Sequence, residues 1–340
     1  MMIDIFNHFM PKAYLDRLGD LIPGHPVLTA FPRLKTLWDV DARRALLDEF
    51  GGTQHVLSLA NPPPELIGPP EKTPELVRMA NDALAEICRR HPDHFPAFIA
   101  SLPMNDASGL LKEAKRAVRE LGAVGVQVFT NVLGRPLTAP QTLPLFELMA
   151  KLDLPIWLHP ARGADFPDYQ KESKSHYEIW WTFGWPYETS AAMAHIVFAG
   201  LFDRFPDLKI ITHHMGGMIP YFEGRVGPGW DQLGKRTSDV DYGKLLKKLK
   251  RRPVDYFRLF YADTALFGAF EATKCGLRFF GPGRVLFASD SPFDPEKGSM
   301  YTRTTIEIVD RLDLSPEERQ AVYEGNARRL LKLPARRGTK

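Results

Sequence analysis

The segment IDIFNH, residues 3–8, is a short apolar run that ends in a histidine. Similar runs rich in Val, Ile, Phe and Leu recur along the chain, and most have the character of strands that are buried on both faces. The predicted strands cover residues 2–8, 54–60, 96–102, 123–130, 155–159, 209–214, 259–264 and 285–291.

Helical patterns separate these strands, at residues 74–90, 107–121, 143–152, 188–204 and 267–279. Strands that alternate with helices favour parallel βαβ units. Eight such units favour closure into a (β/α)8 TIM barrel over an open sheet. We therefore predict an α/β protein with a single barrel domain over residues 1–334. A final helix should begin with a capping box at Ser315-Pro316-Glu317-Glu318, and we expect the basic tail, residues 335–340, to be disordered.

Two connections are long enough to be insertions. Residues 11–53 join strands 1 and 2, and part of this segment should arch over the barrel mouth. Residues 161–186 join strands 5 and 6 and are dense in aromatic side chains. Loops of this size in a compact domain are usually functional, so both are predicted to act as lids.

The composition narrows the class of partner. The 340 residues include 44 Lys and Arg against 41 Asp and Glu, and the net charge of +3 is too small to indicate a nucleic-acid partner. A small anionic substrate is compatible with it. No apolar run reaches the roughly 18 residues of a membrane span, and the start lacks the features of a signal peptide. We expect a soluble cytoplasmic protein in which Cys88 and Cys275 stay reduced.

Four polar residues close separate predicted strands: His8, His159, His214 and Asp290, at the ends of strands 1, 5, 6 and 8. A single histidine at a strand end is usually an ordinary packed residue. Parallel barrel strands, however, deliver their carboxyl ends to one rim, so these four side chains can converge. That coincidence predicts a functional site.

Two imidazoles and a carboxylate are enough to hold a catalytic metal. We predict His8, His159 and Asp290 as the ligands and His214 as the group that moves protons. His213 competes with His214 for that role, and strand alternation should point the two to different sides.

Other polar residues near the predicted rim have two readings each. Asp263, at the end of strand 7, either hydrogen-bonds a catalytic histidine or caps the next helix. Arg162 and Arg225 are candidates for gripping a substrate carboxylate, or are plain surface ion-pair partners. Trp181 is a candidate for stacking on a planar substrate, or for a subunit contact. We read Asp4 as a structural buried carboxylate.

Several motifs together resemble a known family. They are residues 4–8, WTFGWPYET at 181–189, HMGG at 214–217, FASDSP at 287–292 and GNARRL at 325–330. Over nearly its whole length the chain resembles the amidohydrolase superfamily. Within it, the chain is similar to the amidohydrolase-2 branch, which contains aminocarboxymuconate semialdehyde decarboxylase and the γ-resorcylate-type decarboxylases.

The resemblance implies a distorted TIM barrel with one divalent metal, zinc or manganese, and a homodimer. It assigns metal binding to His8, His159 and Asp290, an acid/base role to His214 and a substrate contact to Trp181. No lysine closes strand 4 at residues 127–130, which argues against a binuclear site.

Phe6 departs from the family pattern, which usually places a histidine or glutamate there. Phenylalanine cannot bind a metal, so the site must work with three ligands or without metal, as the related pyrone-dicarboxylate lactonases are thought to do.

The function that these observations favour is non-oxidative decarboxylation of a small aromatic or unsaturated carboxylic acid, with Asp290 or His214 delivering a proton to the carbon that loses CO2. The alternatives are a hydrolase, lactonase or hydratase acting on a related acid, and a barrel that binds a carboxylate ligand without catalysis.

Overall fold

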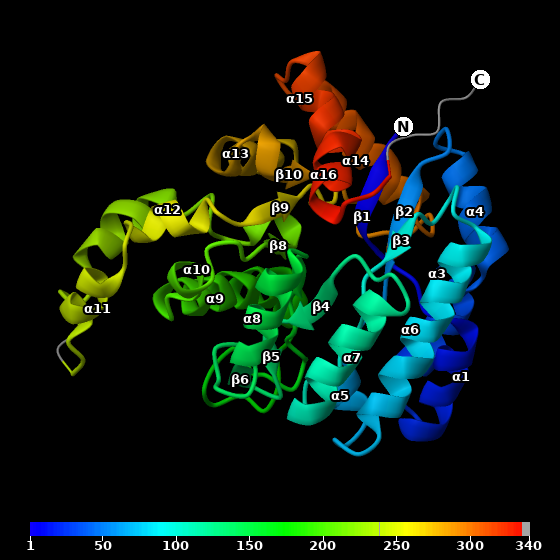
Figure 1. The fold of residues 1–340 in the computed structure, drawn as a ribbon, viewed down its shortest axis with the longest axis horizontal. Coiled ribbons are helices and arrows are strands. Elements are labelled where there is room, and N and C mark those ends of the chain that lie inside the picture. Colours follow the sequence, from blue (N-terminus) through cyan, green and yellow to red (C-terminus); the bar gives the residue numbers. More distant parts are fainter. Residues whose placement is uncertain (238, 335–340) are drawn as a thin grey trace.

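Eight short parallel strands form the centre of the protein in the computed structural model, which describes residues 1–237 and 239–334 (Figure 1). The strands are β1 (Ile3–His8), β2 (Gln54–Ser58), β3 (Ala97–Phe98), β4 (Val126–Phe129), β7 (Ile156–His159), β8 (Ile210–Thr212), β9 (Tyr261–Asp263) and β10 (Val285–Leu286). A small antiparallel hairpin, β5 (Asn131–Val132) and β6 (Arg135–Pro136), lies outside this set. Every predicted strand is present.

The strands close into a ring. They form two parallel sheets, in the orders β1-β2-β3 and β10-β9-β8-β7-β4, and a parallel bridge from Ala100 to Val126 joins β3 to β4. On the other side the Ile5 amide donates to Phe287 O (3.0 Å), and the His8 amide donates to Ser291 O (2.8 Å). The predicted (β/α)8 barrel is therefore confirmed, and the two irregular seams account for its distortion.

Several strands are shorter than predicted. The run 285–291 leaves the regular ladder after Leu286, because the Phe287 amide donates to Val322 O in the π-helical turn Ala321–Gly325. The Asp290 amide then returns to the barrel by donating to Phe6 O (3.0 Å). Residues 287–291 are buried, so their sequence has the apolar character of a strand. Their hydrogen bonds, however, are no longer those of a regular strand.

Helices surround the ring, and α6 lies beside β3 (Figure 1). The predicted helix 188–204 is two helices, since Gly200 has a positive φ of 69° between them. The capping box at Ser315 and Glu318 is present. The helices are α1 (Lys12–Leu21), α2 (Val27–Ala30), α3 (Lys35–Trp38), α4 (Val40–Asp48), α5 (Pro64–Ile67), α6 (Thr73–Arg90), α7 (Ala107–Arg119), α8 (Leu143–Leu152), α9 (Trp185–Phe198), α10 (Leu201–Arg204), α11 (Tyr242–Lys248), α12 (Pro253–Phe257), α13 (Phe270–Phe280), α14 (Ser299–Arg311), α15 (Pro316–Gln320) and α16 (Asn326–Leu331).

The segment between β1 and β2 folds into α1 to α4 and is tied to the end of β1. Arg43 of α4 is fully buried and donates to His8 O and Thr36 O, each at 2.6 Å. The segment after β7 ends in a π-helical turn, Trp180–Gly184, that runs directly into α9. Both segments therefore meet the barrel at the end where β1 and β7 finish.

Apolar side chains fill the barrel interior. Ile5, Val56, Trp157 and Ile211 belong to one buried cluster that also contains Phe6. Asp4 lies within the same barrel wall, where its carboxylate accepts hydrogen bonds from the Phe6 amide (3.0 Å) and from Ser289. These contacts fit the structural role predicted for Asp4. Among the described residues, no helix has the length and apolar character needed to cross a bilayer. The predicted tail, 335–340, lies outside the described residues.

Candidate metal centre

The carboxyl ends of four strands bring the predicted site residues together. His8 and His159 are the last residues of β1 and β7, and their ring centroids lie 5.2 Å apart. Asp290 follows β10, and its Oδ1 lies 2.9 Å from His8 Nε2. His214 follows β8, and its Nε2 lies 3.4 Å from Asp290 Oδ2. All four side chains are buried.

His213 joins the same cluster, and here the prediction from strand alternation is wrong. Its Nε2 lies 3.3 Å from Asp290 Oδ1, and its ring centroid lies 3.8 Å from that of His214. The reason lies in the backbone: His213 is extended, whereas His214 and Met215 have positive φ values of 50° and 52°. The left-handed turn swings the second imidazole back to the side of the first.

The glycines after this turn allow it to pack closely. Gly217 has a positive φ of 61°, and a Cβ there would lie 2.5 Å from the Pro186 carbonyl oxygen. Only glycine accepts both the conformation and the contact. The HMGG sequence therefore holds the two histidines against the start of α9.

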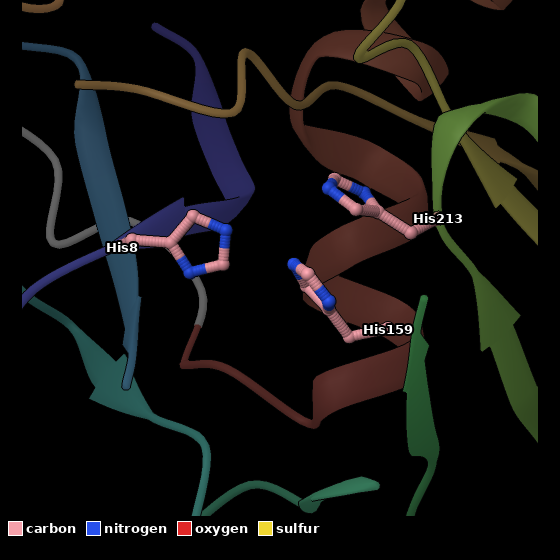
Figure 2. A group of neighbouring side chains, drawn as sticks. All are labelled: His8, His159 and His213. Carbon is pink, nitrogen blue, oxygen red and sulfur yellow. The ribbon is translucent and has the colours of Figure 1, made fainter. Parts of the chain in front are cut away.

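The donor set fits a divalent metal. His8, His159 and His213 each offer a nitrogen, and these atoms all lie within 4.8 Å of one another (Figure 2). His213, His214 and Asp290 form a second, overlapping group. The outer nitrogen of His159 is fixed, since its Nδ1 donates to Pro160 O at 2.7 Å. Such outer contacts orient imidazoles that bind zinc or manganese. The cluster can therefore hold one metal, as predicted.

Burial and hydrogen bonding oppose each other in the protonation of this cluster. Burial raises the pKa of Asp290, but hydrogen bonds from His213, His214 and His8 outweigh it and hold that pKa well below its usual value. Burial also lowers the pKa of His213, but the charge and hydrogen bond of Asp263 raise it to about 9. For His159 and His214 burial dominates and lowers the pKa. Asp290 is thus an anion among imidazoles of different basicity.

Aromatic side chains surround the cluster, and most of them were missed from the sequence. Three of these rings are Trp185, whose centroid lies 5.4 Å from that of His159, Phe293, 5.6 Å from His8, and Phe267, 5.3 Å from His214. Phe293 keeps 38% of its surface exposed. Phe293 directly follows the FASDSP motif, and this position could have identified it as a site residue from the sequence. Trp185 lay within the aromatic segment already identified.

Trp181 and Arg162, two of the predicted substrate contacts, have different surroundings. Trp181 is 36% exposed and lies one ring further out than Phe267, at 5.9 Å from it. The Arg162 guanidinium contacts Glu188 (3.2 Å) and stacks 3.8 Å above Phe166. Its buried Nε has no partner among the described residues.

Arg225 is exposed and lies 6.0 Å above the Phe222 ring. Within residues 1–237 and 239–334, Arg225 makes no hydrogen bond or ring contact with the histidines of the cluster. Its proposed role therefore has no geometric support from the cluster.

Phe6 occupies the inner wall of the cluster. It is fully buried, and its ring stacks on His213 with a centroid distance of 3.6 Å and an interplanar angle of 14°. Its ring also lies 5.6 Å from that of His159. The residue that departs from the family pattern thus packs directly against a histidine of the site.

The chain is similar to known decarboxylases in both sequence and structure. An amidohydrolase family model matches residues 34–333. A γ-resorcylate decarboxylase from Rhizobium radiobacter is 33% identical, over 97% of this chain and 98% of the relative. The structure of a 2,6-dihydroxybenzoate decarboxylase with bound 2,6-dihydroxybenzoate superposes with a TM-score of 0.80 at 29% identity, covering 98% of this chain and 99% of that one.

The dihydroxybenzoic acid decarboxylase of Polaromonas sp. JS666, with bound manganese and the inhibitor 2-nitroresorcinol, superposes with a TM-score of 0.78 at 29% identity. The superposition covers 98% of this chain and 97% of that one. These findings confirm the branch predicted from the sequence motifs.

Proposed function

Because the chain belongs to the amidohydrolase family, we propose that it is a metal-dependent carboxy-lyase that removes CO2 non-oxidatively from a small aromatic carboxylic acid. One observation carries the proposal: a buried cluster of imidazoles and a carboxylate is bordered by a rim of aromatic rings, among them Trp185, Phe267 and Phe293. Such a rim favours a flat, apolar ring whose polar groups reach the cluster. Manganese and aromatic ligands in the similar structures support it.

The residues divide the chemical work among them. His8, His159 and Asp290 would hold the metal. A bound divalent cation supplies positive charge beside the oxygen on which charge develops during C–C cleavage. Trp185 and Phe293 orient the substrate ring and exclude water from the reacting carbon.

The proton reaches the substrate through His214, which Asp290 holds by a hydrogen bond (3.4 Å); because burial lowers the pKa of His214, its protonated imidazole gives up a proton readily. As the bond to the carboxylate carbon breaks, its electron pair stays on the ring carbon and forms a C–H bond with that proton. CO2 leaves, and one proton from solvent returns to His214, so no electrons are gained or lost.

Trp181 and Arg162, predicted from the sequence as substrate contacts, would touch the substrate from the outer side of this rim. Trp181 is suitably exposed to cover a ring that is already seated against Phe267. The unpartnered Nε of Arg162 supports its proposed contact with a substrate carboxylate. A raised KM in Trp181→Leu and Arg162→Met, with kcat retained, supports these contacts. The same measurement on Arg225→Met tests that remaining candidate.

A panel of aromatic acids tests the activity. We expect manganese-loaded protein to convert one or more hydroxybenzoates, beginning with 2,6-dihydroxybenzoate, into the corresponding phenol. In D2O the product should carry one deuterium at the carbon that lost CO2. Asp290→Asn should abolish turnover, whereas Asp313→Asn, at an exposed position, should not. Hydrolysis or hydration of the acids without CO2 would contradict the proposal.

We also propose a cytoplasmic homodimer. Exposed aromatic side chains at Phe166, Tyr169, Phe183 and Tyr187 offer a surface for a second copy, and the free state of Cys88 and Cys275 suits a reducing compartment. Sedimentation equilibrium should give twice the chain mass of 38.5 kDa. A monomer at micromolar concentration would contradict the dimer.

A further inference from the structure

We propose that His213 is an additional protein ligand of the metal, which replaces the ligand lost at position 6. The inference rests on the proposed metal dependence and goes beyond it, because it makes the donor set His8, His159, His213 and Asp290. Three imidazoles and one carboxylate then surround a single ion, and His214 remains outside its coordination sphere.

The positions of the nitrogen atoms are the first support. His213 forms one group with His8 and His159, whose donor atoms lie within 4.8 Å of one another. Two ligands at about 2.1 Å from one ion lie roughly 3–4 Å apart, so small side-chain movements close the site. Figure 2 shows the three rings turned toward a common space from β1, from β7 and from the segment after β8.

Asp263 provides the second support, as a positioning residue. Its Oδ2 accepts a hydrogen bond from His213 Nδ1, and both side chains are fully buried. Its Oδ1 accepts from the Ala265 amide at 3.0 Å, which fixes the carboxylate. A carboxylate behind one imidazole nitrogen leaves the other nitrogen free to bind metal, the arrangement typical of metal-binding histidines.

Phe6 provides the third support. Its ring packs face to face with the His213 ring at 3.6 Å, so the two side chains occupy adjoining space on the same wall. A metal-binding side chain at position 6 would meet an imidazole that already fills this part of the cluster. Phe6 instead restricts the movement of the His213 ring by packing against it, which favours His213 as a metal ligand of fixed orientation.

The same geometry separates the roles of the two adjacent histidines. His213 is fully buried, and its two nitrogens face Asp263 and Asp290. His214 lies on the aromatic side of the cluster, with its ring 5.3 Å from Phe267. His214 is therefore the imidazole that can reach a substrate, and His213 is the one that can reach only the metal.

Pulsed EPR on manganese-loaded protein with 15N-labelled histidine tests the assignment by counting bound imidazole nitrogens. We expect three in the wild type, two in His213→Asn and three in His214→Asn, which is the matched control. His213→Asn should weaken Mn2+ binding more than about 100-fold, and Asp263→Asn by about 10–100-fold. Circular dichroism confirms that each variant is folded.

A double variant keeps the test decisive if His213→Asn fails to fold. Phe6→His combined with His213→Gly should restore three imidazoles, because it moves the ligand to the first strand. Two nitrogens in the wild type, or three in folded His213→Asn, would overturn the proposal, as would a count in His214→Asn one lower than in the wild type. Wild-type protein that binds no Mn2+ would also overturn it. All these outcomes are measured by EPR on bound Mn2+. A failure to release CO2 is measured separately, and it would contradict the proposed activity instead.

Discussion

A buried glutamate offers a quantitative test of the structure away from the metal. Glu65 lies in α5, just after β2, and is 5% exposed. Neither of its carboxylate oxygens has a hydrogen-bond partner among the described residues, and neither does the buried Tyr14 hydroxyl. Burial raises the pKa of Glu65 from 4.5 to about 7. Ionised Glu65 should therefore destabilise the fold.

The sign and size follow from proton linkage. Below pH 4.5 both the folded and the unfolded chain hold the proton, so Glu65 costs nothing. Between pH 4.5 and 7 the unfolded chain releases it first, and stability falls as the pH rises. Above pH 7 the cost is constant at about 3.5 kcal/mol, at roughly 1.4 kcal/mol for each pH unit between the two pKa values.

Glu65→Gln removes this loss, since the amide does not ionise. Urea unfolding of both proteins at pH 5 and pH 8 should show the advantage of the variant growing by about 2.5 kcal/mol between the two conditions. Glu71→Gln, at an exposed position, serves as the control and should show no such growth. An equal difference at pH 5 and pH 8 would refute the reasoning.

Three further substitutions test the site and its support. Phe6→Ala should cost about 3–5 kcal/mol in urea unfolding of the metal-free protein, because it empties a fully buried site, whereas Tyr221→Ala, 81% exposed, should change stability by less than about 0.5 kcal/mol. Trp185→Leu should raise the KM for an aromatic acid by up to about tenfold, through loss of ring contacts worth roughly 0.5–1.5 kcal/mol, and an unchanged KM would remove Trp185 from the substrate rim. Gly217→Ala should lower the unfolding temperature and the activity together, since its Cβ would lie 2.5 Å from a carbonyl oxygen; an unchanged unfolding temperature would contradict the packing described for this turn.

The sequence predicted those features that depend on regular strands. His8 and His159 end β1 and β7, so the barrel rule that parallel strands share one rim was enough to bring them together. Asp290 was also predicted, although it lies beyond the regular part of β10. Its apolar run stays in the barrel wall, so the pattern led to the correct rim.

Features that depend on irregular backbone escaped prediction. Strand alternation separated His213 from His214, and it failed because the left-handed turn at His214 interrupts the alternation. The helix expected over 188–204 is broken at Gly200, whose positive φ no periodic pattern reveals. Trp185 and Phe293 were missed as site residues because their proximity to histidines arises from the path of the chain after a strand, where hydrophobic periodicity carries no information.

Release of CO2 from a carboxyl-labelled substrate tests the central claim most directly. Protein stripped of metal and then reloaded with Mn2+ would be given 2,6-dihydroxybenzoate labelled with 13C in the carboxyl group. The account predicts 13CO2 and resorcinol in equal amounts, with a rate that rises with bound manganese up to one ion per chain. Loss of substrate without 13CO2, or equal 13CO2 from the stripped protein, would contradict it.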